Sequence, residues 1–205
     1  MKRFILSLLG ALSISNAALA YEQAPYTVLE KQDAIEIRQY EPIIVAMVTL
    51  EGERKKTINQ SFRILFDYIS GNNTAQKEIK MTVPVTQTNE QGGQEIKMTV
   101  PVTQQEDDNG TYSTTFMMPS EWTMKTLPKP NNDDIRLVEV PEKKMIAIQF
   151  SGFAGPQSLA EETEKLLAFA KKKKLKTLGA AVHAYYNDPF TLPWWRRNEV
   201  LFEIK

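Results

Sequence analysis

The sequence contains no cysteine and only one histidine, His183, among its 205 residues. Without thiols the chain cannot form disulfides, Fe–S clusters, thiolate zinc sites or a cysteine nucleophile. It also lacks the glycine-rich phosphate and dinucleotide loops, the H-E-x-x-H zinc motif and the G-x-S-x-G nucleophile motif. A serine triad would need His183 as its base, and no serine context marks a partner. This inventory favours a binding function over catalysis.

An excess of positive charge is also missing. The chain has 25 basic and 25 acidic side chains, and the acidic ones outnumber the basic ones by two once Lys2 and Arg3 are set aside. Nucleic-acid binding normally requires a basic face, so we expect no nucleic-acid partner. After residue 20 no apolar run is long enough to cross a bilayer, so we expect no stable membrane insertion.

The first twenty residues have the pattern of a secretory signal peptide. Lys2 and Arg3 give a positive start, residues 4–12 form a short apolar run, and residues 18–20 read A-L-A, a small-residue cleavage site. The sequence therefore predicts export, most simply to a bacterial periplasm. The remaining residues, 21–205, are numerous enough to bury a core without disulfides, and we expect them to form one domain.

The most distinctive stretch of the sequence is written twice. Residues 77–87 and 94–104 are identical at ten of eleven positions, at an offset of 17 residues. In each copy apolar and polar residues alternate, which predicts a half-buried strand. Proline cannot donate to a sheet, so each copy should be an edge strand or end its pairing at the proline. Either one strand of a hairpin around residues 89–93 has been duplicated, or the apolar face with Met81 and Met98 lines a pocket.

A second, more diverged repeat divides the chain into two halves, at about residues 26–118 and 119–205. Each half opens with a predicted strand pair joined by a proline-containing turn, at residues 35–50 and 135–150. A one-sided apolar helix follows each pair, and further strands follow each helix. The apolar stripes are formed by Ile58, Phe62, Leu65, Phe66 and Ile69 and by Leu159, Thr163, Leu166, Leu167 and Ala170. We expect Phe62 and Phe66 to face the sheet or a ligand groove and not bulk solvent. This order predicts an α+β fold, with an antiparallel sheet curved towards a barrel and one helix per half packed on it.

Apolar and polarisable side chains are the binding chemistry that the sequence does have. Such side chains can build a cleft for a flat hydrophobic ligand, although side chains of this kind more often belong to the core. The candidates for such a cleft are Phe62, Phe66, Met81, Met98, Tyr185 and Trp194.

Residues 194–197, which read W-W-R-R, have the least core-like composition. Two tryptophans beside two arginines could grip a ligand that has an apolar body and a carboxylate edge, with Trp194 and Arg196 as the contacts. Alternatively, the arginines pair with Glu199 or Glu203 and only hold the loop in place.

Several of these motifs together resemble one known family, the SOUL heme-binding proteins. They are the I-K-M-T-V-P-V strand, the helix end at residues 62–71 followed by Asn72-Asn73, F-M-M-P at 116–119, F-S-G at 150–152 and the P-F-x-x-P-W-x-R-R-N-E-V ending at 189–200. The similarity covers about residues 26–204. It implies a distorted antiparallel β-barrel of two similar halves with two flanking helices. This fold is similar to the effector-binding domains of some drug-responsive bacterial transcription regulators.

The resemblance implies that heme or another tetrapyrrole is the cofactor and partner, bound without catalysis in a shallow apolar groove beside the first helix. On this sequence that helix carries Phe62 and Phe66, and Arg196 and Arg197 are the cations of the last loop. The alternatives are a binding module for another hydrophobic effector and, less consistent with the catalytic inventory, a tetrapyrrole-modifying enzyme.

His183 is the one imidazole that could bind the iron of a heme. In its predicted strand it shares a face with Ala181 and Tyr185, while Val182, Ala184 and Tyr186 share the other face. A neutral imidazole is a good iron ligand. The SOUL family does not rely on a fixed histidine, however, and a lone histidine in a strand is often a hydrogen-bonded structural residue.

The signal peptide gives a direct test. We expect cleavage after Ala20, because the small residues at 18–20 follow the apolar run at the usual distance. Mass spectrometry of the protein from an expressing bacterial cell should show Tyr21 as its first residue. An intact N-terminus on protein recovered from the cytosol would contradict the prediction.

Overall fold

The computed structural model of the chain describes residues 21–75, 93–107, 109–188 and 190–205. The first half contains β1 (Glu22–Gln23), β2 (Tyr26–Gln32), β3 (Ile35–Tyr40), β4 (Ile43–Glu51), α1 (Arg54–Ile69), β5 (Asn73–Thr74), β6 (Thr99–Val100), β7 (Val102–Glu106) and β8 (Thr111–Met117). The second half contains β9 (Lys129–Pro130), β10 (Ile135–Val140), β11 (Lys143–Phe150), α2 (Pro156–Lys173), β12 (Thr177–Tyr185), η1 (Pro193–Trp195) and β13 (Asn198–Ile204).

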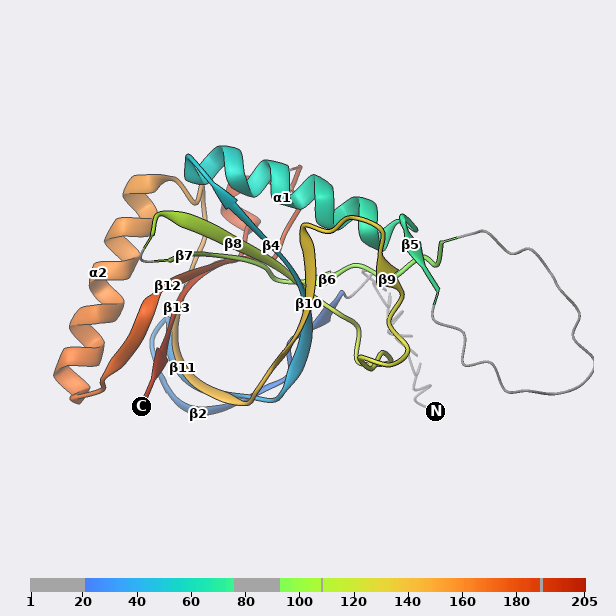
Figure 1. Cartoon of the computed structure of the whole chain (residues 1–205). Coiled ribbons are helices and arrows are strands. Elements are labelled where there is room, and N and C mark those ends of the chain that lie inside the picture. The colour runs from blue at the N-terminus through green and yellow to red at the C-terminus, as the bar shows by residue number, and fades with distance from the viewer. Residues whose placement is uncertain (1–20, 76–92, 108, 189) are drawn as a thin grey trace, which may run out of the picture.

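Nine of the strands form one antiparallel sheet in the order β10-β4-β8-β7-β12-β13-β11-β3-β2. The sheet curls into a barrel, and both helices lie on its convex outer side (Figure 1). Apart from β2, the order is symmetric about the β7–β12 pair, so that α1, β4 and β8 of the first half correspond to α2, β11 and β13 of the second. The prediction of an α+β fold with a distorted barrel of two similar halves is confirmed.

The predicted strand pairs are wrong, although all four of their strands exist. β3 pairs with β11 and β2, and β4 pairs with β10 and β8, so each half lends its first strand to the other half. A two-residue hairpin favours type I′ or II′ turns, which need a positive φ at the first central position. Glu41 and Pro141 occupy that position, and neither residue adopts a positive φ readily. The chain therefore crosses to the opposite half of the sheet instead of folding back.

The second copy of the duplicated stretch also departs from its prediction. It forms β6 and β7, interrupted at Pro101, and β7 lies in the middle of the sheet between β8 and β12, not at an edge. Pairing does change at the proline, as expected. Ile96, Met98 and Val102 pack beneath α1, whereas Val100 packs on the concave side, so the apolar residues do not share one face. The first copy, with Met81, lies outside the described residues, as do residues 89–92 of the expected hairpin.

The two helices are held on the sheet by apolar burial. Leu65, Tyr68 and Ile69 of α1 are buried against a cluster that includes Val48 and Phe116. Leu159, Leu166, Phe169 and Ala170 of α2 are buried in an equivalent cluster of the second half. Burying one large aliphatic or aromatic side chain stabilises the fold by about 1.5–3 kcal/mol, so these stripes fix both helices on the convex side.

A buried ion network lies on the concave side of the sheet and is centred on Glu199 in β13. Its carboxylate accepts hydrogen bonds from Arg38 Nη1 at 2.7 Å and Nη2 at 3.0 Å, and from Tyr186 Oη at 2.9 Å. Arg197 adds bonds from Nε at 3.0 Å and Nη2 at 2.8 Å. Burial alone would raise the pKa of Glu199, but the two arginines outweigh burial and hold the pKa below its ordinary value. Of the two roles considered for the loop arginines, pairing with Glu199 is correct for Arg197.

Asn73 clamps the two ends of the segment that carries residues 76–92. Its Nδ2 donates to the carbonyl oxygens of Tyr68 and Gln94, both at 2.8 Å, and its Oδ1 accepts from Gln94 N at 2.8 Å. Beside this clamp the backbones of Gly71 and Gly93 lie in close contact. A Cβ atom added to Gly93 would lie 1.4 Å from the carbonyl oxygen of Gly71. Position 93 therefore requires glycine for a close backbone approach.

Replacing Glu199 by glutamine should destabilise the protein by about 3–5 kcal/mol, because the change removes the carboxylate that both terminal nitrogens of buried Arg38 contact and leaves only Glu36, which accepts from Nε at 2.8 Å. The matched control is Glu203→Gln on the same strand, which removes a partly exposed pair with Lys143 at 3.4 Å and should cost less than about 1 kcal/mol. Urea unfolding measures both values. Equal losses in the two variants would contradict the assigned role of Glu199.

The same network predicts how stability depends on pH. The folded-state pKa of Glu199 lies below its unfolded value, so its contribution is present at neutral pH and is lost as the pH falls through the acid range. Unfolding measured from about pH 7 to about pH 3 should therefore show a steeper acid loss in the wild type than in Glu199→Gln.

Candidate functional site

Arg54, the first residue of α1, connects three parts of the convex side. Its Nη1 donates to Tyr185 Oη at 2.9 Å, and its Nη2 lies 3.5 Å from the carbonyl oxygen of Ala154, in the segment between β11 and α2. The side chain therefore ties the start of α1 to β12 and to the segment that leads into α2. Tyr185, a predicted site residue, is positioned by this contact.

His183 lies two residues before Tyr185 and projects to the same side of β12. It pairs in register with Gln104 of β7 and Val200 of β13 and is partly buried. Burial, and then the positive charge of Arg54, lower the pKa of His183 to about 4. The imidazole is therefore neutral at physiological pH, which is the form that can bind a metal.

The exposed side of α1 carries an aromatic pair. The rings of Phe62 and Phe66 stack with centroids 5.9 Å apart, and Phe62 meets Phe116 of the core edge-on at 5.3 Å. Phe66 is 47% exposed and does not face the sheet, so a ligand groove, the other place predicted for it, stays a prediction. Successive helical residues are about 100° apart, and with Leu65 pointing into the sheet Phe66 is turned outwards. Met98, another candidate, is partly buried against the same cluster.

A second aromatic group sits on the two loops beyond β11 and β12. Trp194, Trp195 and Phe153 are 64%, 71% and 67% exposed. The loops are joined by a hydrogen bond from Gly152 N to the carbonyl oxygen of Pro193 at 2.8 Å. Arg196 donates from Nε to the carbonyl oxygen of Thr191 at 2.8 Å, and its guanidinium lies 5.2 Å from the centre of the Phe153 ring. Exposed apolar surface of this extent commonly marks an interaction site.

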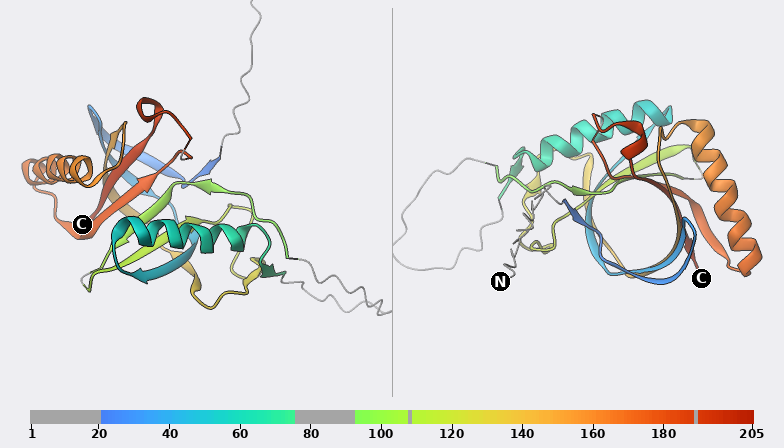
Figure 2. Two further views of the ribbon diagram at one scale, coloured as in Figure 1. Left: turned by 90° about the horizontal axis from the view of Figure 1, so that it is seen from above. Right: turned by 180° about the vertical axis from the view of Figure 1, so that it is seen from behind.

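The structure thus places the predicted residues in two groups on one side of the barrel. Phe62, Phe66 and Met98 belong to α1 and its core, with Tyr185 and His183 tied to the start of that helix by Arg54. Trp194 and Arg196 lie with Phe153 on the loops. Figures 1 and 2 show α1 and the η1 loop on the same outer side of the sheet. Met81 lies outside the described residues.

Two residues of this surface were not predicted. Arg54 opens a helix whose first turn contains no acidic residue, although the helix dipole favours acidic side chains there. That mismatch was a signal in the sequence that the arginine has another role. Phe153 directly follows the F-S-G motif, but nothing in its spacing indicates that it meets Arg196.

This surface suits a ligand with a flat apolar body and an anionic edge. The aromatic rings can cover the apolar body of the ligand, and the arginines can face its anionic edge. The neutral imidazole can bind a metal ion that the ligand carries. In the described part of the chain, no three His, Asp or Glu side chains gather to hold a metal ion by themselves. Over the same residues, no helix combines the length and the apolar character that a bilayer span requires.

The fold places the chain in a structural class of α+β proteins with a curled antiparallel sheet, and it is similar to several solved structures. The EcmrR C-terminal domain matches with a TM-score of 0.60 at 10% identity, covering 88% of this chain and 98% of that one. A hydrolase from Listeria innocua matches with a TM-score of 0.56 at 14% identity, covering 86% and 94%. At these identities the likeness concerns the fold alone.

The chain belongs to the SOUL heme-binding protein family, whose model matches residues 21–203. Heme-binding protein 2 of Mus musculus is 27% identical over 183 residues, covering 87% of this chain and 82% of the relative. Heme-binding protein 2 of Homo sapiens is 27% identical over 181 residues, with the same coverage. The resemblance seen in the sequence motifs is confirmed.

The low pKa of His183 is directly measurable. Nuclear magnetic resonance of the imidazole should give a titration midpoint near pH 4, because burial and Arg54 both disfavour the charged ring. The folded pKa is depressed, so the contribution of His183 to stability is complete above about pH 6.5 and is lost as the pH falls towards 4. A midpoint near the unperturbed value would show that the imidazole is solvated.

Proposed function

We propose that this protein is an exported, non-catalytic heme- or tetrapyrrole-binding protein that buffers or transfers its ligand. The observation that carries the proposal is the convex surface, where exposed aromatic rings lie with arginines and a neutral imidazole in a member of the SOUL heme-binding family. A tetrapyrrole such as heme has a flat apolar macrocycle and carboxylate side groups, which this combination of side chains matches.

The residues present fit the ligand in distinct roles. Phe66, stacked on Phe62, offers a ring face that is already exposed and held in place, so binding costs little side-chain ordering. Trp194 and Phe153 offer further apolar surface on the loops beyond β11 and β12. Arg54 and Arg196 supply positive charge for carboxylates. A bound heme would add an iron centre, for which His183 is the imidazole candidate.

Export and the absence of catalysis rest on the sequence. The signal-peptide pattern at residues 1–20 supports release into the periplasm. One histidine, no cysteine and no recognised catalytic motif support binding without chemistry. A periplasmic binding protein of this kind would keep a poorly soluble macrocycle in solution between a donor and an acceptor.

A hemin titration with two helix variants tests this function. Wild-type protein should give a saturable Soret band at one heme per chain, and Phe66→Ala should weaken binding about tenfold, a loss near 1.4 kcal/mol. The control is Leu167→Ala, because Leu167 occupies the position of Phe66 on α2 and is also exposed. Absence of saturable binding, or equal weakening by both changes, would overturn the proposal.

Stability has to be measured alongside binding. Phe66 is half-exposed, so Phe66→Ala should cost less than the 3–5 kcal/mol that removal of a buried phenylalanine costs.

The visible spectrum of His183→Ala with hemin tests whether His183 binds the iron, and circular dichroism checks that the variant is folded. Loss of a low-spin signature assigns the axial ligand to His183, and an unchanged spectrum and affinity remove His183 from the site.

A further inference from the structure

The concave side of the sheet, opposite the helices, contains a cavity that the proposed tetrapyrrole surface does not use. This lumen has a volume of about 280 Å³. Its apolar lining includes Val45, Met145, Val182, Ala184 and Leu201, from four different strands. Ligand sites are commonly apolar cavities of roughly this size or larger, with a few polar groups at defined places. The lumen therefore suits a slender apolar group.

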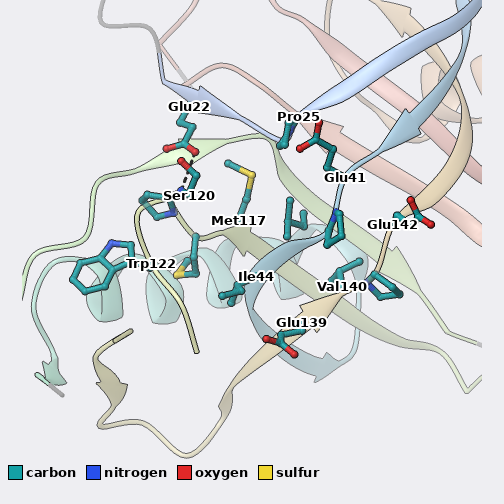
Figure 3. A pocket seen from close by; sticks show the side chains of 15 residues that line it. Glu22, Pro25, Glu41, Ile44, Met117, Ser120, Trp122, Glu139, Val140 and Glu142 are labelled. Atoms are coloured by element: carbon teal, nitrogen blue, oxygen red, sulfur yellow. Dashed lines mark hydrogen bonds between the residues drawn. The ribbon is translucent and has the colours of Figure 1, made fainter. Parts of the chain in front are cut away.

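At one end the lumen adjoins a wider cavity of about 830 Å³ at the rim of the barrel, shown in Figure 3. The two cavities share Glu41, Ile43, Met117, Val140 and Pro141. One molecule can therefore extend from the rim into the lumen. Ile44, Met118 and Trp122 add apolar surface to this mouth.

The charge of the mouth is of one sign. Its lining contains Glu22, Glu41, Glu139 and Glu142, and no lysine, arginine or histidine among the described residues. Figure 3 shows these glutamates coming from different segments around the cavity. Glu22 also accepts a hydrogen bond from Ser120 N at 2.9 Å. The basic residue that lines the lumen, Lys143, is paired with Glu203 at 3.4 Å. The mouth thus attracts cations and repels anions.

From this arrangement we infer a second binding site, for an amphipathic organic cation whose apolar tail lies in the lumen and whose charged head lies among the four glutamates. Apolar burial supplies attraction for the tail. The carboxylates and the ring of Trp122 suit a quaternary ammonium head, which aromatic faces also attract. The carboxylates of a tetrapyrrole would be repelled by this mouth, which therefore favours a different ligand from the convex surface.

The test compares two probes with the same tail and opposite charge. Calorimetry should show octyltrimethylammonium binding the full-length protein at one site, with octanoate at least tenfold weaker, both below their micelle-forming concentrations. Glu41→Gln combined with Glu139→Gln should weaken the cation about tenfold or more, because both side chains are exposed at the mouth and their loss removes half of its charge. The control, Glu164→Gln on the exposed side of α2, should leave the affinity unchanged.

A second variant tests the lumen separately. Val182→Phe fills the lumen from β12 and should weaken the cation without changing the hemin titration, since the aromatic pair of α1 lies on the opposite side of the sheet. If this variant does not fold, the exposed mouth variant still decides the question. Equal affinity for octanoate, or unchanged cation affinity in the Glu41 and Glu139 double variant, would overturn the site whatever the result with hemin.

Discussion

A carboxylate buried away from water is the constraint on which the rest of this structure depends. Glu199 can stay ionised in the barrel only because Arg38, Arg197 and Tyr186 surround it with hydrogen bonds. Arg38 comes from β3 and Glu199 from β13, 161 residues apart, and both strands flank β11. The network therefore stabilises the arrangement in which β3 completes the sheet of the other half. Through Arg197 it also fixes the end of the loop that carries Trp194 and Trp195.

The curled sheet separates a convex surface from a concave lumen, and β12 contributes side chains to both. Along β12, His183 and Tyr185 project to the convex side, near Arg54, while Val182 and Ala184 line the lumen. Strand alternation is enough to produce this separation. The convex side has aromatic rings and arginines, and the concave side has an apolar lumen with an acidic mouth. The two proposed sites would therefore lie on opposite sides of the same nine-stranded sheet and would select ligands of opposite charge.

The sequence predicted most of the elements, because alternation and helical periodicity are local properties. It did not predict which strands pair, since pairing depends on whether a turn can close, and the turns with Glu41 or Pro141 do not form tight hairpins. The sequence left open whether Phe66 faces the sheet or a groove, because a stripe drawn from periodicity is wider than the surface that a sheet covers. Within the candidate site, Arg197 could be matched with Glu199 two residues away. The hydrogen bond between Arg54 and Tyr185 joins residues 131 positions apart, and no local pattern in the sequence predicts it.

The clamp at Asn73 has a consequence for how this chain has diverged. Because Asn73 binds Gln94 directly, the fold fixes the two ends of the intervening segment and leaves its length open. Between Asn73 and Gln94 lie 20 residues, of which 3 would remain without the 17-residue repeat, and lengthening a closed loop by that factor costs about 1.7 kcal/mol in chain entropy. The fold can therefore accommodate a 17-residue tandem duplication between Asn73 and Gln94 without loss of the barrel. Because Asn73 and Gln94 hold these two ends together, the segment between them is a suitable place to insert a foreign peptide or a second domain.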